Sequence, residues 1–151
     1  MYGVLVTLHS VTRWFVIIAA VYALYVAFSG WFGRRAYGTA ARRAGAIFGG
    51  ITGIQFILGL LVYFWPTGLV MGVLGNAGMA GAMRNPDLRF YVVEHIVAMV
   101  VAVSLVHIGS AVAKRRPTDT GRFRAAAVFW SIGTLLILAS IPWSRALPMV
   151  S

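Results

Sequence analysis

The sequence predicts an all-α integral membrane protein, a bundle of four transmembrane helices with both termini on the outer face of the membrane. Two observations predict this class. The chain is 60% hydrophobic and only 11% charged, whereas the apolar share of a soluble domain is nearer half. Its apolar residues gather in long segments, each long enough for a helix to cross a hydrocarbon core, which needs about 20 residues. We therefore expect residues 1–151 to form a single transmembrane domain.

The predicted spans follow one another with short connections and no appended soluble domain. They cover approximately residues 3–32, 45–65, 90–113 and 123–143. The first is not read as a cleaved signal peptide, because it lacks a basic leading segment, contains Arg13 and is longer than a signal core. The connection 66–88 is rich in Gly and Met, so we expect it to lie in the outer interface or against a partner.

The loop charges predict the orientation. Nine of the 13 basic side chains flank the first and third connections. These nine are Arg34, Arg35, Arg42, Arg43, Lys114, Arg115, Arg116, Arg122 and Arg124. The positive-inside rule makes that side cytoplasmic and puts the second connection and both termini outside.

The charge balance and the missing cysteines exclude several functions. A net charge of +10 suggests nucleic acid in a soluble protein, but here the cations separate apolar spans, so we expect a lipid bilayer and no nucleic acid as partner. A chain with no cysteine forms no disulfide, no thiolate-ligated iron–sulfur cluster and no covalent c-type heme.

Ionisable groups inside membrane spans are costly, so they are the first candidates for function. The polar candidates within or at the ends of the spans are His9, Arg13, Gln55, Glu94, His95 and His107. They include no Ser-His-Asp set, phosphate loop or paired-carboxylate site. The sequence therefore favours an electron-transfer or accessory subunit over an enzyme that acts alone.

His9 and His95 form the strongest pair. Their helices both enter from the outside, and at about 1.5 Å per residue each histidine lies roughly 9 to 10 Å past its helix start. Two imidazoles at one level can ligate the iron of a b-type heme from its two faces. His107 is roughly 18 Å deeper, so the sequence permits one heme near the outer face and excludes two stacked hemes.

Each of these residues also has a plainer interpretation. The histidines can hydrogen-bond carbonyl groups, which is the interpretation we favour for His107. Arg13 shares a helix face with His9, and it can pair a heme propionate, neutralise Glu94 or serve packing alone. Glu94 can orient a ligand, carry protons or neutralise the charge of Arg13. The Gln55 side-chain amide can hydrogen-bond to another helix without any cofactor.

Several strings resemble a family of small bacterial four-helix membrane proteins labelled cytochrome-b-like. The strings are LHSVTRW at 8–14, IQFILGLLVYF at 54–64, RFYVVEH at 89–95, IGSAVAKRRPTDTGRF at 108–123 and IPW at 141–143. The resemblance spans nearly the whole chain. It implies one heme b per chain, the bacterial cytoplasmic membrane, and His9, Arg13, Gln55, Glu94 and His95 as the site; at the position of His107 it implies no ligand.

A looser resemblance, carried by the LHS stretch before Trp14, is to the heme-containing membrane protoporphyrinogen oxidase family. The third span lacks the lysine that this second family would imply, which speaks against oxidase activity.

The sequence-based hypothesis is a b-type heme subunit that passes electrons near the outer face, with His9 and His95 as the iron ligands. Its expected partners are a respiratory or photosynthetic membrane complex or further copies of itself, and a quinone. The competing hypothesis is a cofactor-free accessory or assembly subunit of a larger membrane complex. The apolar outer connection and the glycine-rich second span motivate that alternative.

Overall fold

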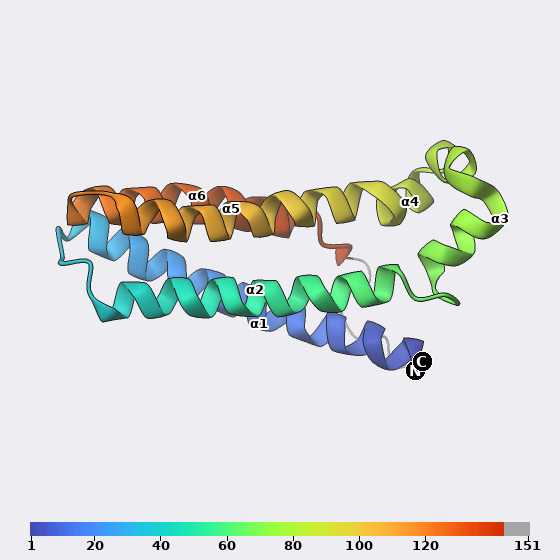
Figure 1. Ribbon diagram of the computed structural model, residues 1–151, viewed down its shortest axis with the longest axis horizontal. Helices are drawn as coiled ribbons and strands as arrows, with labels where there is room; N and C mark the ends of the chain where they lie inside the picture. Colours follow the sequence, from blue (N-terminus) through green and yellow to red (C-terminus); the bar gives the residue numbers. More distant parts are fainter. Residues whose placement is uncertain (144–151) are drawn as a thin grey trace.

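The computed structural model describes residues 1–143 and consists of helices joined by short connections (Figure 1). The long helices are α1 (Tyr2–Phe32), α2 (Thr39–Tyr63), α5 (His95–Arg115) and α6 (Asp119–Ala139). Between α2 and α5 lie α3 (Leu69–Arg84), the single turn α4 (Pro86–Arg89) and a π-helical segment (Phe90–Glu94). The predicted all-α class is confirmed.

Four helical stretches are long and apolar enough to cross a membrane. They are Tyr2–Phe32, Thr39–Tyr63, Pro86–Arg115 and Asp119–Ala139. The third stretch runs continuously through α4, the π-helical segment and α5. The protein is therefore a multi-pass helical membrane protein, as the composition predicts. The predicted position of the C-terminus falls on residues 144–151, outside the described residues.

The observed boundaries correct the predicted spans at two places. The second span begins at Thr39 rather than near 45, so Arg42 and Arg43 lie on the first turns of α2 instead of in a loop. The fourth spans Asp119–Ala139 rather than 123–143. Its start is fixed by Thr118, whose hydroxyl accepts a hydrogen bond from the Gly121 amide at 3.1 Å, an N-cap that hydropathy alone does not reveal.

The four long helices form two antiparallel pairs, α1 with α2 and α5 with α6 (Figure 1). The two pairs meet where α1 contacts α6 and α2 contacts α5. At the end with the first and third connections, the contact surfaces are built from alanine and glycine, which let helix backbones approach closely. The buried small residues there include Ala23, Ala27, Ala41, Ala44, Ala113, Ala126 and Ala127.

The second connection is largely helical, because α3 occupies most of it at the opposite end of the bundle (Figure 1). Gly78 interrupts α3 with a φ of 65°, a left-handed conformation that glycine adopts without strain. The Tyr2 hydroxyl accepts a hydrogen bond from the Leu69 amide at 3.2 Å. This bond ties the start of α3 to the start of α1.

A built turn leads from α3 back into the bundle. The Asn85 side chain accepts hydrogen bonds from the amides of Asp87 and Leu88 at 3.0 and 3.3 Å, and Pro86 fills the first position of α4. An asparagine cap followed by proline is a strong helix start. The turn fixes where the third span begins and so helps to set the depth of His95.

Candidate functional site

A cavity lies between the two helix pairs, toward the end that carries α3. Its volume is about 600 Å³, within the range of roughly 300 to 1,000 Å³ that ligand pockets occupy. Residues from α1, α2 and α5 form most of its wall, and Ile141 and Pro142 close it after α6. The wall is mainly apolar, with a few polar side chains, as is usual for a cofactor or small-molecule site.

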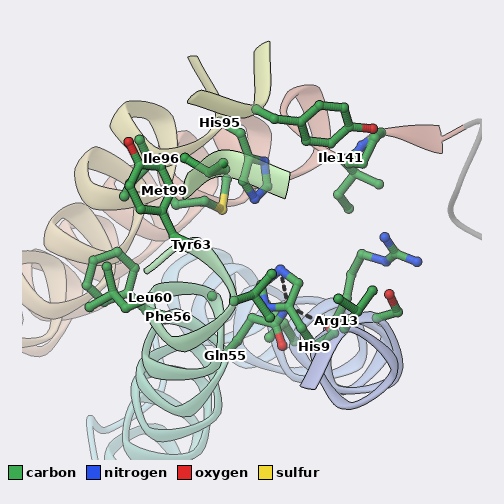
Figure 2. Close-up of a pocket in the computed structure, with 18 of the residues that line it drawn as sticks. His9, Arg13, Gln55, Phe56, Leu60, Tyr63, His95, Ile96, Met99 and Ile141 are labelled. Carbon is green, nitrogen blue, oxygen red and sulfur yellow. Dashed lines mark hydrogen bonds between the residues drawn. The ribbon is translucent and has the colours of Figure 1, made fainter. Parts of the chain in front are cut away.

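Two histidines face this cavity from opposite helix pairs (Figure 2). The ring centres of His9 on α1 and His95 on α5 are 6.3 Å apart, and their ring planes are inclined by 80°. The sequence predicts that these residues share a depth, and their proximity confirms that prediction. The two rings lie edge to face, and both line the cavity wall.

The protonation of His95 is set by a backbone carbonyl. Its ring Nδ1 lies 2.8 Å from the carbonyl oxygen of Ser140, just after the end of α6. A carbonyl only accepts, so Nδ1 carries the proton and donates it, which leaves Nε2 with a lone pair. This is the arrangement by which metal-binding histidines are usually oriented.

His9 is held by α2. The Gln55 side-chain amide donates a hydrogen bond of 2.9 Å to the His9 carbonyl and lies 3.4 Å from the His9 ring Nε2 (Figure 2). The second contact is long for a hydrogen bond and therefore weak. One turn further along α2, Gly59 leaves room for the ring, because a Cβ there would lie 3.0 Å from the His9 Cε1 atom. Gln55 and Gly59 together seat the imidazole against α2.

Two buried polar atoms of this wall have no hydrogen-bond partner within residues 1–143. They are Nδ1 of His9 and Oε1 of Gln55. A buried polar atom without a partner costs about 1–3 kcal/mol. This cost is unusual in a native packing and points to a group that binds in the cavity and interacts with this wall.

Arg13 brings a positive charge to the same cavity. It lies one turn after His9, lines the cavity wall and is only 8% exposed. Its guanidinium carbon lies 5.8 Å from the centre of the Trp14 ring. A buried guanidinium beside two imidazoles gives the cavity a positive potential, which favours an anionic group on a ligand.

Glu94 does not join the other predicted site residues. Its Oε1 atom lies 2.6 Å from Nε of Arg89, both side chains are exposed, and Glu94 does not line the cavity. The reason is helical geometry, since neighbouring residues on a helix point about 100° apart. With His95 turned inward, Glu94 is turned away. His107 is also separate, and it lines a second, smaller cleft near the opposite end.

The sequence does not single out two further contributors. Tyr63 donates a hydrogen bond of 2.9 Å to the Val92 carbonyl, inside the π-helical segment that leads into His95. π-helical turns often lie beside functional sites. The spacing of four residues that joins Gln55, Gly59 and Tyr63 on one face of α2 is the signal that could have found it. The Ser140 carbonyl, being backbone, leaves no such signal.

The side chains of the cavity suit a metal whose other ligands come from a cofactor. Within residues 1–143 no group of three His, Asp or Glu side chains comes together to hold a bare ion. Two opposed imidazoles are sufficient for a heme, whose macrocycle supplies the other four nitrogens. The apolar wall and the buried cation both fit such a group.

Comparisons of the chain with protein-family models, with curated proteins and with solved structures gave no match.

Proposed function

We propose that the protein binds one b-type heme in the cavity between the helix pairs, where His9 and His95 would hold its iron, and serves as a one-electron carrier in the membrane. The observation that carries this proposal is the 6.3 Å between the two ring centres. At this spacing His9 and His95, from opposite helix pairs, could both bind the iron of one heme.

The side chains around the pair support the same function. The bond from Nδ1 of His95 to the Ser140 carbonyl leaves Nε2 as the ligand atom. Gln55 fixes α1 at the level of His9 through the His9 carbonyl. Arg13 brings a buried positive charge to the cavity wall, which favours the carboxylates that a heme carries. A bound heme would supply one-electron chemistry through its ferric and ferrous states.

The expected place of this electron carrier follows from charge. The cation-rich first and third connections define the cytoplasmic side by the positive-inside rule, so the proposed heme lies near the outer face. One heme near one face cannot carry electrons across the whole bilayer. We therefore propose that the chain exchanges electrons with a quinol or with a larger respiratory or photosynthetic complex in the bacterial cytoplasmic membrane.

The test is a reduced-minus-oxidised visible spectrum of the detergent-purified protein, with a pyridine hemochrome assay to count heme. We expect a b-type signal at about one heme per chain, as one histidine pair requires. His9→Ala and His95→Ala should each lose the signal, and His107→Ala is the matched control that keeps it. Heme retained at full occupancy in both site variants would contradict the ligand assignment.

A protein that stays colourless when expressed with heme supplied would favour the second candidate function, an accessory subunit without a cofactor. The exposed apolar side chains of α3 favour that candidate specifically. Leu69, Met79 and Met83 are 40%, 51% and 45% exposed. Exposed apolar surface of this kind, at the end of a bundle, suits contact with a partner or with lipid.

A further inference from the structure

A second cleft lies between α2 and α5, near the end with the first and third connections. Its volume is about 160 Å³, and Arg42, Lys114, His107, Ser110 and Tyr37 line it together with glycines of α2. It is separate from the histidine cavity, with which it shares no lining residue. The heme proposal makes no use of it.

The cleft is basic and has no acidic side chain in its wall. The chain contains three acidic side chains, Asp87, Glu94 and Asp119. Glu94 lies 2.6 Å from Arg89, and Asp119 lies 3.5 Å from Arg122. None of the three lines the cleft, so the charges of Arg42 and Lys114 are left for an anion from outside the chain.

Tyr37 adds a neutral donor. Its side chain is buried at the base of the connection between α1 and α2, with its ring 4.9 Å from that of Phe123. Burial raises the pKa of Tyr37 above its ordinary value, although the nearby charges of Arg122 and Arg42 act in the opposite direction. The hydroxyl keeps its proton at neutral pH and can donate to an anion's oxygen.

Glycines give the cleft its depth. A Cβ on Gly49 would lie 3.3 Å from the His107 ring, whereas a Cβ on Gly50 would meet no atom within 4 Å. At Gly50 the wall of α2 is therefore open. The missing side chains leave backbone within reach of a small anionic group.

Apolar rows continue from the cleft along both helices. Ile54 and Ile57 follow Gly50 at spacings of four and seven residues and are 57% and 59% exposed. Val100 precedes His107 by seven residues and is 45% exposed. Residues at these spacings share a helix face, so the basic cleft opens onto apolar surface in the direction of the membrane interior.

We propose that this cleft binds the phosphate group of an anionic phospholipid, with Arg42 and Lys114 as the charged partners, Tyr37 as a donor, and the acyl chains along the exposed rows of α2 and α5. Basic pockets between membrane helices bind lipid headgroups in this way. The apolar rows favour a lipid over free phosphate, because a free anion gains nothing from them.

The test measures lipid binding by native mass spectrometry of the detergent-purified protein, titrated separately with phosphatidylglycerol and phosphatidylcholine. We expect one phosphatidylglycerol to bind with clear preference. Each basic side chain beside an anionic lipid contributes about a fivefold factor, so the Arg42→Gln/Lys114→Gln variant should bind roughly twenty-five-fold more weakly. The Arg43→Gln/Arg115→Gln variant removes the same charge from the same helices outside the cleft, and should change binding less than threefold.

A second variant keeps every charge. Gly50→Leu places a side chain in the open part of the cleft and should also abolish the preference for phosphatidylglycerol, with helicity checked by circular dichroism. Equal binding of the two lipids would overturn the proposal, because the cleft would then not select an anionic headgroup. An equal loss in the control variant would overturn it in favour of diffuse surface charge. Inorganic phosphate that displaces phosphatidylglycerol at an equal concentration would assign the cleft to free phosphate instead.

Discussion

The two ends of the helix bundle differ in how the space between the helices is filled. At the end with the first and third connections, alanine and glycine bring the helices together, and Phe48 and Trp130 fill the space that remains. At the end with α3, the helix pairs enclose a cavity of about 600 Å³ lined by His9, Arg13 and His95. Apart from the small cleft between α2 and α5, side chains fill the first end, the closed end, whereas the second, the open end, leaves a volume for a ligand.

This difference shows that the closed end contributes most to stability, whereas the open end holds the candidate functional site. Within a membrane, helices gain little from excluding lipid, so close packing of small residues and interhelical hydrogen bonds hold them together. The closed end supplies both, since Trp130 donates hydrogen bonds to the Val106 carbonyl at 3.2 Å and the Ser110 hydroxyl at 3.3 Å. The open end can then keep buried polar atoms without hydrogen-bond partners among the described residues, such as Nδ1 of His9 and Oε1 of Gln55. The packing of the closed end offsets the loss of stability that these atoms cause.

The largest expected effect on folding is at Gly109, in the contact between α5 and α6. A Cβ there would lie 2.5 Å from the Cβ of Phe129, an atom too close to the backbone to move aside. Gly109→Ala should force the two helices apart and lower the free energy of unfolding by about 3 kcal/mol, the upper range for overpacking. Denaturation followed by circular dichroism in detergent measures this loss. Gly50→Ala, which meets no atom within 4 Å, should leave stability unchanged or slightly higher.

Trp130→Phe should have the next largest effect on stability. The indole is 1% exposed, and phenylalanine keeps most of its volume but neither hydrogen bond to α5. We expect a loss of about 1–2 kcal/mol in the same unfolding experiment. Trp143→Phe is the control, since that side chain is 53% exposed. An equal loss in both variants would show that the closed end does not depend on this interhelical bond.

Gly59→Ala tests the open end. The added methyl group meets the His9 ring at 3.0 Å, so the imidazole must shift by a few tenths of an ångström while the fold persists. We expect heme affinity to fall about tenfold, as for other changes beside a metal ligand, with little change in unfolding. Heme titration of the apoprotein measures this, and Gly50→Ala on the same helix should retain wild-type affinity. A large loss of stability in Gly59→Ala would contradict the prediction that the open end contributes little to the free energy of unfolding.

The smallest expected effect is that of Tyr63→Phe. It removes only the bond to the Val92 carbonyl, which braces the π-helical segment before His95. We expect a loss of about 1 kcal/mol or less and a shift in the heme reduction potential, because the orientation of an axial ligand tunes the iron. Redox titration reads the shift. Tyr25→Phe is the control at a 68% exposed position, and an equal shift there would argue against bracing by Tyr63.

Much of the fold could be predicted from the sequence, because a membrane constrains it strongly. A helix satisfies all its backbone hydrogen bonds internally, so a long apolar stretch in a bilayer has almost no alternative structure. Hydropathy also predicts which histidines share a depth, since rise per residue fixes depth. The start of α6 after Thr118 could not be predicted from hydropathy, because it depends on an N-cap and not on apolar content.

The sequence by itself therefore determined the class of protein, the four spans and the shared level of His9 and His95. Only the tertiary structure decided how the helices rotate and pair. Rotation turned Glu94 outward to Arg89 and brought Gln55 to His9. Pairing brought the Ser140 carbonyl to His95 and assembled Arg42 and Lys114, 72 positions apart in the chain, into one cleft. The physical reason is that contacts between helices depend on side-chain packing across the whole bundle, which no single span encodes.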